Sequence, residues 1–179
     1  SGKTYAALQR FREAHEAAYL APLRLLALEV YENTNEAGVA CSLLTGEEEN
    51  LIEGASHVAE TIEMADMGRL YEVAVIDECQ MIADESRGGA WTAAILGICA
   101  EEIHICMAPH AESIVRRLIE YCDDEIVEIN RKERMTPLTL DEDGFRFPDK
   151  VKPGDALIVF SKRSVINVAA EIQAKGIAC

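Results

Sequence analysis

Ser1-Gly2-Lys3-Thr4 opens the chain and matches the last four positions of the phosphate-binding loop G-x-x-x-x-G-K-[ST]. Helical periodicity follows at once, over residues 5–18. In such a loop the lysine places a positive charge beside the β- and γ-phosphates, and the threonine hydroxyl ligates magnesium. Four residues match by chance in many proteins, so the interpretation depends on a second motif further along the chain.

That second motif is Val73-Ala74-Val75-Ile76-Asp77-Glu78-Cys79-Gln80, an apolar run that ends in two adjacent acids. A strand that ends in this way is typical of the Walker B half of a nucleotide-hydrolysing site. Asp77 is expected to hold the metal through water, and Glu78 to orient or deprotonate the attacking water. The plain alternative is an exposed acidic turn. The run before the acids is too apolar to favour it, and the two motifs together predict a P-loop nucleotide hydrolase.

The chain begins inside its own motif. A P-loop lies between a strand that enters it and a helix that leaves it, and the expected strand and first loop glycine are absent here. We therefore expect the sequence to be a fragment, from which a targeting segment cannot be judged.

Composition excludes some classes of function. The 179 residues are 49% hydrophobic and carry a net charge of −15, which argues against a broadly basic nucleic-acid-binding surface. It leaves open phosphate binding by main-chain amides at helix starts. The six cysteines form no C-x-x-C pair, which argues against zinc and disulfides and favours a reducing compartment. Cys41, Cys99 and Cys106 are expected to be buried thiols. No apolar run is long enough for a membrane helix.

Short apolar runs alternate with helical patterns, which predicts an α/β fold with a parallel sheet covered by helices on both faces. Strands are expected over residues 18–21, 39–44, 56–59, 71–76, 103–107, 126–129 and 155–160. Helices are expected over residues 5–18, 23–37, 90–100, 112–122 and 162–175. Residues 131–153 are rich in charge, proline and glycine and are typical of an interdomain connection.

The chain resembles a known family, the mitochondrial degradosome RNA helicases (Suv-type, superfamily 2) and their bacterial relatives. The resemblance runs almost end to end and rests on these blocks: Ser1-Gly2-Lys3-Thr4, Ala21-Pro22-Leu23-Arg24-Leu25-Leu26-Ala27, Thr45-Gly46-Glu47-Glu48, Thr61-Ile62-Glu63-Met64, Asp77-Glu78-Cys79-Gln80 and Met135-Thr136-Pro137-Leu138. It implies a first RecA-like lobe without its first strand at residues 1–130, a linker at 131–153, and the first βα unit of a second RecA-like lobe at 154–179.

The resemblance also implies an activity: ATP-dependent unwinding of RNA in RNA turnover, with ATP and Mg²⁺ as cofactors. RNA and an exoribonuclease would be the partners, with no membrane. The location would be the mitochondrial matrix in a eukaryote or the cytoplasm in a bacterium, and the sequence alone leans to the cytoplasm. Because the arginine finger of such motors lies late in the second lobe, residues 1–179 alone are expected to be nearly inactive.

The site residues follow from the motifs and the resemblance together. The nucleotide would be held by Ser1, Gly2, Lys3 and Thr4, and magnesium by Thr4 and Asp77. Lys3, Glu78 and Gln80 would act in catalysis, Gln80 by linking the nucleotide site to neighbouring motifs. RNA would be bound by Pro22, Arg24, Thr45, Gly46 and Thr61.

Several other residues have plainer interpretations. His57 and Trp91 are expected to be core residues, Cys79 a filler, and Glu47-Glu48-Glu49 a solvated loop, while Arg87 has no role that can be derived. The run Met107-Ala108-Pro109-His110 stands where the family has a glycine and an acid, so its coupling role stays open.

Two alternatives remain. Thymidine-kinase-type nucleoside kinases also combine S-G-K-[ST] with D-E-x-Q, although they usually carry paired cysteines for zinc. A nucleic-acid-binding module without turnover is the other, and the intact Lys3, Thr4, Asp77 and Glu78 speak against it.

Overall fold

A computed structural model describes residues 3–127, 129, 139–140 and 144–178 of the chain. These residues belong to two compact units, Ser1–Met135 and Thr136–Cys179. The sheet and all the nucleotide-site candidates belong to the first unit.

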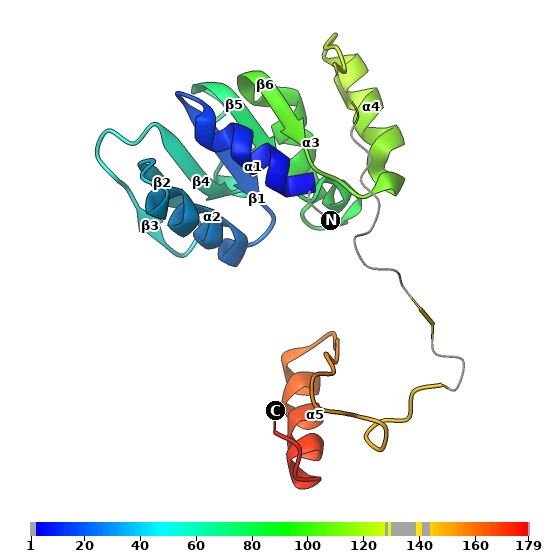
Figure 1. Cartoon of the computed structure of the whole chain (residues 1–179). Helices are drawn as coiled ribbons and strands as arrows, with labels where there is room; N and C mark the ends of the chain where they lie inside the picture. The colour runs from blue at the N-terminus through cyan, green and yellow to red at the C-terminus, as the bar shows by residue number, and fades with distance from the viewer. Residues whose placement is uncertain (1–2, 128, 130–138, 141–143, 179) are drawn as a thin grey trace. The chain divides into compact units, whose positions relative to one another are not determined.

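The first unit is built on a six-stranded sheet with the order β3-β2-β4-β1-β5-β6 (Figure 1). The strands are β1 (Ala17–Ala21), β2 (Cys41–Leu44), β3 (Glu49–Asn50), β4 (His57–Thr61), β5 (Leu70–Ile76) and β6 (Cys99–Ile105). Every neighbouring pair is parallel except β2 and β3. The predicted parallel sheet is therefore confirmed, with one short antiparallel strand at its edge, where the acidic run had predicted a loop.

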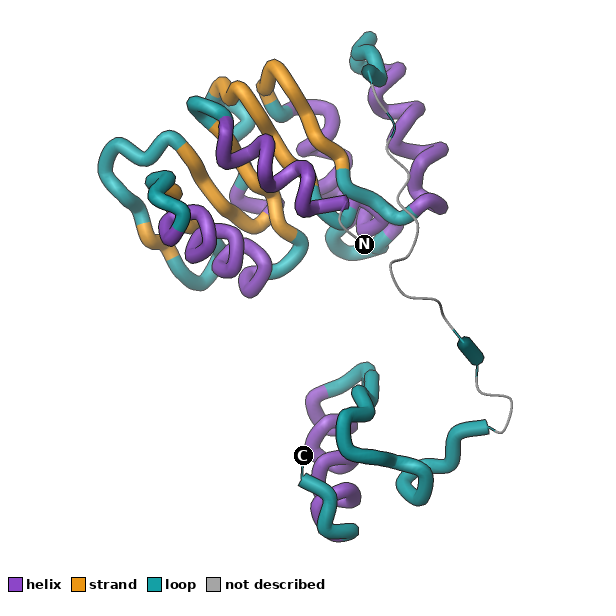
Figure 2. Tube along the Cα trace, viewed as in Figure 1, coloured by secondary structure: helices purple, strands orange, loops and turns teal. Residues whose placement is uncertain are grey.

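Helices cover both faces of this sheet, as predicted (Figure 2). They are α1 (Lys3–Glu13), α2 (Arg24–Glu36), α3 (Gly88–Gly97) and α4 (Glu112–Tyr121), with short 3-10 helices η1 (Ile62–Met64), η2 (Cys79–Ala83) and η3 (Pro109–Ala111). One apolar cluster joins α1 and α2 to the sheet around Phe11 and Tyr19. The other joins α3 and α4 to the opposite face around Leu20 and Trp91. Successive residues of β1 thus enter different cores, which is why this central strand is buried along its whole length.

Two predicted boundaries were wrong for the same reason. The alanine-rich pattern predicted helix through residue 18, and again from 90 to 100, because alanine favours helix. In the structure α1 ends at Glu13 and Ala17 and Ala18 pair with β4 and β5 in the sheet. Similarly, α3 ends at Gly97, and β6 begins at Cys99 rather than at residue 103. Pairing with neighbouring strands outweighs local helix propensity at both places.

The early start of β6 also corrects the expectation for Cys99. Cys41 and Cys106 are buried cysteines as predicted, but Cys99 is exposed at the start of this edge strand. A strand at the end of the sheet order needs less apolar sequence, so the segment Cys99-Ala100-Glu101-Glu102 did not look like a strand.

Further along, two predicted strands are not found. Ile126, Val127 and Ile129 are described without strand structure, and residue 128 lies outside the described residues. Residues 155–160 of the second unit are also described without strand structure, and Phe160 is fully exposed. A β-strand is held by hydrogen bonds to a neighbour, and apolar sequence alone does not supply one.

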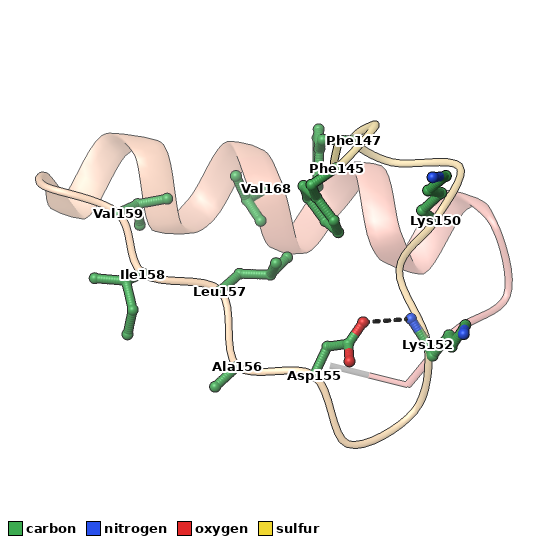
Figure 3. Close-up of a pocket in the computed structure, with 10 residues that line it drawn as sticks. All are labelled: Phe145, Phe147, Lys150, Lys152, Asp155, Ala156, Leu157, Ile158, Val159 and Val168. Atoms are coloured by element: carbon green, nitrogen blue, oxygen red, sulfur yellow. Dashed lines mark hydrogen bonds between the residues drawn. The ribbon is translucent and has the colours of Figure 1, made fainter. Parts of the chain in front are cut away.

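The second unit does contain the predicted helix, α5 (Lys162–Ala174). Ser161 caps it, because its hydroxyl accepts a hydrogen bond from the Ser164 N–H at 3.1 Å. Figure 3 shows a hollow beside this helix, lined by apolar side chains such as Phe145, Phe147 and Leu157 and by the charged Lys150, Lys152 and Asp155. The hollow carries no residue of either nucleotide motif. Most of the predicted linker, residues 130–138 and 141–143, lies outside the described residues.

Gly88, at the start of α3, is a position where only glycine fits. A Cβ there would lie 2.3 Å from the carbonyl oxygen of Ile82, whereas at neighbouring Gly89 it would meet no described atom within 4 Å. Gly88→Ala is therefore expected to destabilise the protein by about 1–3 kcal/mol through overpacking. Gly89→Ala, the matched control, should be neutral or stabilising by up to about 1 kcal/mol. Urea unfolding followed by Trp91 fluorescence measures both, and equal midpoints would contradict the close approach.

Candidate nucleotide and RNA site

The predicted site residues gather along one edge of the sheet. The parallel strands β2, β4, β1 and β5 are neighbours, and their last residues lie level. Leu44 pairs with Glu60, Ala21 with Thr61, and Leu20 with Ile76. The residues that follow these strands therefore lie together at the carboxyl-end edge of the sheet, where open α/β sheets bind their ligands.

The nucleotide end of this edge brings Thr4 and Asp77 together. Thr4 lies in the first turn of α1, and its hydroxyl donates to Asp77 Oδ1 at 3.3 Å. The two motifs, which are 73 residues apart in sequence, are thus in direct contact, as predicted. Ser1 and Gly2 lie outside the described residues, and Lys3 is described only as the first residue of α1.

Asp77 is a buried carboxylate held by several donors. The Glu78 N–H donates to Oδ1 at 2.9 Å, and the Tyr19 hydroxyl donates to Oδ2 at 2.9 Å. Burial raises the pKa of Asp77, and the hydrogen bonds from Tyr19, Glu78 and Thr4 oppose that rise. Sequence reasoning missed Tyr19. Its signal was a tyrosine in a small, fully apolar strand, because a buried phenol needs a hydrogen-bond partner.

The Tyr19 hydroxyl gives a test of how Asp77 is oriented. Tyr19→Phe removes one donor and keeps the ring that packs against Phe11. The loss of a hydrogen bond to a charged group costs about 1.5–3 kcal/mol, so we expect ATP turnover to need a higher magnesium concentration in this variant. A magnesium titration of the ATPase rate checks this, and an unchanged half-saturating concentration would show that Tyr19 only packs.

Glu78 has a left-handed backbone conformation, with φ 50° and ψ 44°. This conformation is uncommon for residues other than glycine and costs of order 1–3 kcal/mol where the fold imposes it. Here it makes the sharp turn from β5 into η2 and leaves Glu78 partly exposed beside buried Asp77. Such strain is concentrated at functional sites.

Gln80 connects Glu78 to the segment after β6. Its amide Nε2 donates to Glu78 Oε2, and its Oε1 accepts a hydrogen bond from the Ala108 N–H at 2.9 Å. This contact reaches the segment Met107-Ala108-Pro109-His110, whose residues depart from the family pattern. Because the donor is a main-chain N–H, the contact does not depend on the departing side chains.

The neighbouring residues behave as the sequence predicted. Cys79 is fully buried, and Trp91 is fully buried with its indole N–H donating to the Asp77 carbonyl oxygen at 3.0 Å. His57 is a satisfied core histidine: its ring nitrogens lie 2.8 Å from Ser56 Oγ and 2.8 Å from the Phe11 carbonyl oxygen. Burial lowers the pKa of His57, which suits a neutral core residue.

The remaining edge positions hold the predicted RNA contacts. Pro22 follows β1, Thr45 and Gly46 follow β2, and Thr61 ends β4. The N-cap of α2 is Leu23, whose apolar side chain cannot accept a hydrogen bond, so first-turn amides remain for an outside acceptor. Arg24 lies beside them, with Nη1 at 3.4 Å from Glu47 and 3.8 Å from Glu48.

Thr45 is used differently from expectation. Its side chain is buried, its hydroxyl donates to the Glu48 carbonyl oxygen at 2.9 Å, and it accepts from the Glu48 N–H at 3.0 Å. The hydroxyl is thus engaged in shaping its own turn. Gly46 is exposed beside it, and a Cβ there would meet no described atom within 4 Å. The Thr45 N–H donates to the Glu48 carbonyl oxygen, and the N–H groups of Glu47 and Glu48 donate to the Thr45 hydroxyl, so Gly46 carries the exposed main chain of this turn.

Glu60 is a buried carboxyl at the same edge that sequence reasoning did not single out. It is 1% exposed, and its Oε1 has no hydrogen-bond partner among the described residues. Its neighbours in register are Leu20 and Leu44. Burial, reinforced by the Asp66 carboxylate and opposed by Arg69, raises the pKa of Glu60 to about 8.

The donor set fits one divalent cation of the magnesium type. Thr4 and Asp77 supply a hydroxyl and a carboxylate in contact, and Mg²⁺ prefers a few such oxygens together with water and phosphate. No group of three or more His, Cys, Asp or Glu side chains suited to a metal occurs in the described part of the chain. The same residues contain no helix long and apolar enough to span a membrane.

A helix that begins at a phosphate-loop lysine and threonine, packed against a strand that ends in an acid pair, defines a P-loop nucleotide-binding lobe. The chain belongs to the Suv3 helicase family: the family model for the DEXQ-box helicase domain of Suv3 matches residues 1–131. The α/β sheet described above is the RecA-like fold expected of that family, so the predicted fold class and the family resemblance are both confirmed.

Relatives agree along almost the whole chain. The mitochondrial ATP-dependent RNA helicase SUPV3L1 of Danio rerio is 45% identical and covers 100% of this chain, and that of Homo sapiens is 44% identical over 99%. The mitochondrial DExH-box ATP-dependent RNA helicase DExH18 of Arabidopsis thaliana is 48% identical over 97%. The chain spans only 22–24% of the length of these three relatives.

Proposed function

We propose that this chain forms the nucleotide-binding lobe of an ATP-dependent RNA helicase. One observation carries the proposal: a single sheet edge joins the Thr4–Asp77 contact to the turns after β1, β2 and β4. The relatives are named as ATP-dependent RNA helicases, which supports ATP and RNA as the ligands of this edge.

The proposed domain layout keeps the boundaries expected from the sequence. Residues 1–130 form the first lobe, 131–153 the connection, and 154–179 the start of a second lobe. The division of the chain into two compact units at Met135 and Thr136 supports a boundary within the connection. Helix α5 supports the helical part of the unit proposed beyond it.

In the proposed mechanism, the main chain of Ser1 and Gly2 and the Lys3 ammonium hold the β- and γ-phosphates. Thr4 and Asp77 would hold Mg²⁺, which neutralises charge on the phosphates. The hydrogen bonds to Asp77 from Tyr19 and the Glu78 N–H orient that carboxylate and oppose the rise of its pKa on burial.

Glu78 is proposed to orient or deprotonate the water that attacks the γ-phosphate. Its left-handed backbone projects it from the end of β5, and Gln80 fixes one carboxylate oxygen by a hydrogen bond. Because Gln80 also accepts a hydrogen bond from the Ala108 N–H, movement of the segment after β6 would shift Gln80 and with it the Glu78 carboxylate. This supports the linking role predicted for Gln80.

RNA is proposed to lie along the ends of β1, β2 and β4, with its phosphates on main-chain amides rather than on a basic patch. The first turn of α2 beside Pro22 and Arg24, the turn at Thr45 and Gly46, and Thr61 would make these contacts. The net charge of −15 is compatible with this arrangement, since main-chain donors need no surplus of lysine and arginine.

The test uses the full-length protein. ATP hydrolysis is measured alone, with single-stranded RNA, and with thymidine. Stimulation by RNA without phosphorylation of thymidine is the expected result. Thymidine phosphorylation would support the kinase alternative instead, and RNA binding without turnover would support the binding module.

Two further points belong to the proposal. The relatives carry mitochondrial names, which favours the mitochondrial matrix over the cytoplasm toward which the sequence leaned. An exoribonuclease partner remains a prediction of the family resemblance, which co-purification of the full-length protein would test.

A further inference from the structure

Arg87 connects two of the strand-end segments. It is the N-cap residue of α3, and both Nε and Nη2 lie 2.8 Å from Glu63 Oε1. Nη2 also donates to the Pro22 carbonyl oxygen at 2.7 Å. Pro22 follows β1 and Glu63 lies in η1 after β4, so one guanidinium ties together two segments proposed to meet RNA.

The same guanidinium reaches the Walker B aspartate through Trp91. Its central carbon lies 5.4 Å from the centroid of the Trp91 ring, a cation–π distance. The Trp91 indole N–H donates to the Asp77 carbonyl oxygen at 3.0 Å. Because Trp91 is fully buried, its ring cannot tilt without moving its neighbours. A continuous contact path therefore runs from Pro22 and Glu63 to the turn that carries Asp77 and Glu78.

The backbone of Arg87 is fixed independently of this path. Asp84 Oδ1 accepts hydrogen bonds from the N–H groups of Ser86 at 2.9 Å and Arg87 at 2.8 Å. The Gly88 N–H donates to the Asp84 carbonyl oxygen at 2.9 Å, where only glycine can approach Ile82 so closely. With its main chain held in this way, the response of Arg87 to a ligand is confined to its side chain, which is 34% exposed.

We propose that Arg87 is a positioning residue that couples RNA binding at the strand-end edge to the geometry of the Asp77–Glu78 turn; this rests on the proposed function. An RNA phosphate at the start of α2 moves the Pro22 carbonyl away from Arg87, without itself contacting the guanidinium. This change shifts the guanidinium over Trp91 and so alters the hydrogen bond to the Asp77 carbonyl. RNA binding thereby biases the water-activating carboxylate of Glu78.

The central test is Arg87→Ala in the full-length protein, with ATP turnover measured against RNA concentration. The maximal RNA-stimulated rate is expected to fall by about 5- to 150-fold, the usual range of coupling between sites. The RNA concentration at half-maximal rate, and its dependence on salt, should stay as in the wild type. Arg87→Lys should not restore stimulation, because one ammonium cannot bind both acceptors and stack on the ring.

Glu63→Gln supplies a second variant that cannot fail by unfolding the core, since this side chain is 43% exposed. It should lower stimulation in the same direction, and Arg87→Ala combined with Glu63→Gln should lose no more than Arg87→Ala alone, because both act on one contact. Arg116→Ala is the matched control. It breaks a comparable pair, Arg116–Glu112 at 2.8 Å on α4, and should leave stimulation unchanged.

Other outcomes would overturn the proposal. If Arg87→Ala reduces the salt slope of RNA binding by about one, Arg87 contacts an RNA phosphate directly. If turnover without RNA falls by the same factor as turnover with RNA, Arg87 only supports the Asp77 turn. A wild-type protein whose ATPase ignores RNA would refute the proposed function, and the coupling role would fall with it.

Discussion

Glu78→Gln in the full-length protein is expected to lower RNA-stimulated ATP turnover by about 10²–10⁴-fold while ATP still binds. Glutamine keeps the size and polarity of the side chain but cannot accept the proton of the attacking water. The Thr4–Asp77 contact does not involve the Glu78 carboxylate. Equilibrium binding of a fluorescent ATP analogue, measured beside the steady-state rate, separates the two effects.

Lys3→Ala provides the contrast. Loss of the lysine side chain removes the charge that holds the phosphates, so both ATP binding and ATP turnover should fall. A Glu78→Gln protein that cannot bind ATP, together with a Lys3→Ala protein that binds normally, would reverse the proposed roles. Glu78→Gly is an informative companion: it also removes the carboxylate, but relief of the left-handed backbone should make this variant no less stable than the wild type.

Glu60→Gln is expected to stabilise the protein at alkaline pH and to have little effect near pH 5. Folding raises the pKa of Glu60 from 4.5 to about 8, so between these values the folded state binds more protons than the unfolded state. The unfolding free energy of the wild type therefore falls as pH rises through this range, by an amount on the order of 3–5 kcal/mol if the carboxyl ionises in place. Glutamine resembles the protonated acid and removes this dependence.

Urea unfolding at about pH 5 and about pH 9 measures the effect, with fluorescence of Trp91, the only tryptophan in the chain, as the signal. Trp91 and the register neighbour of Glu60, Leu20, belong to the same apolar cluster, so the signal reports on the right core. Glu53→Gln, at an exposed position, is the control and should change little at either pH. A Glu60→Gln protein with the wild-type pH dependence would show that the carboxyl finds a partner in solution.

The sequence predicted those features of the fold that arise from local motifs or from the periodicity of apolar residues. The P-loop end, the acid pair and the alternation of short apolar runs with helices were sufficient for the α/β sheet and the contact of Thr4 with Asp77. Boundaries failed where pairing outweighed propensity, as at Ala17 and Cys99. The predicted strand over residues 155–160 failed because apolar sequence cannot supply the neighbour that a strand requires.

The sequence did not predict the contacts between side chains from different strands and turns of the sheet. The Tyr19–Asp77 bond depends on the register of β1 with β5, and the Arg87 contacts depend on where two strand-end turns meet. The Glu60 carboxyl, whose Oε1 has no hydrogen-bond partner within the described ranges, could not be found by pattern either, since a glutamate in a short strand is ordinarily assigned to a solvated face. In each case the sequence gives the type of residue, but the fold determines which residue it contacts.

The bond from the Ala108 N–H to Gln80 has a consequence for how this segment can diverge among relatives. A main-chain donor does not depend on the side chain of its own residue, so substitutions at position 108 can leave the contact to Gln80 in place. Only one substitution at position 108 is barred on chemical grounds: proline, which has no N–H to donate. The contact therefore constrains the main chain at position 108 and leaves the identity of its side chain open.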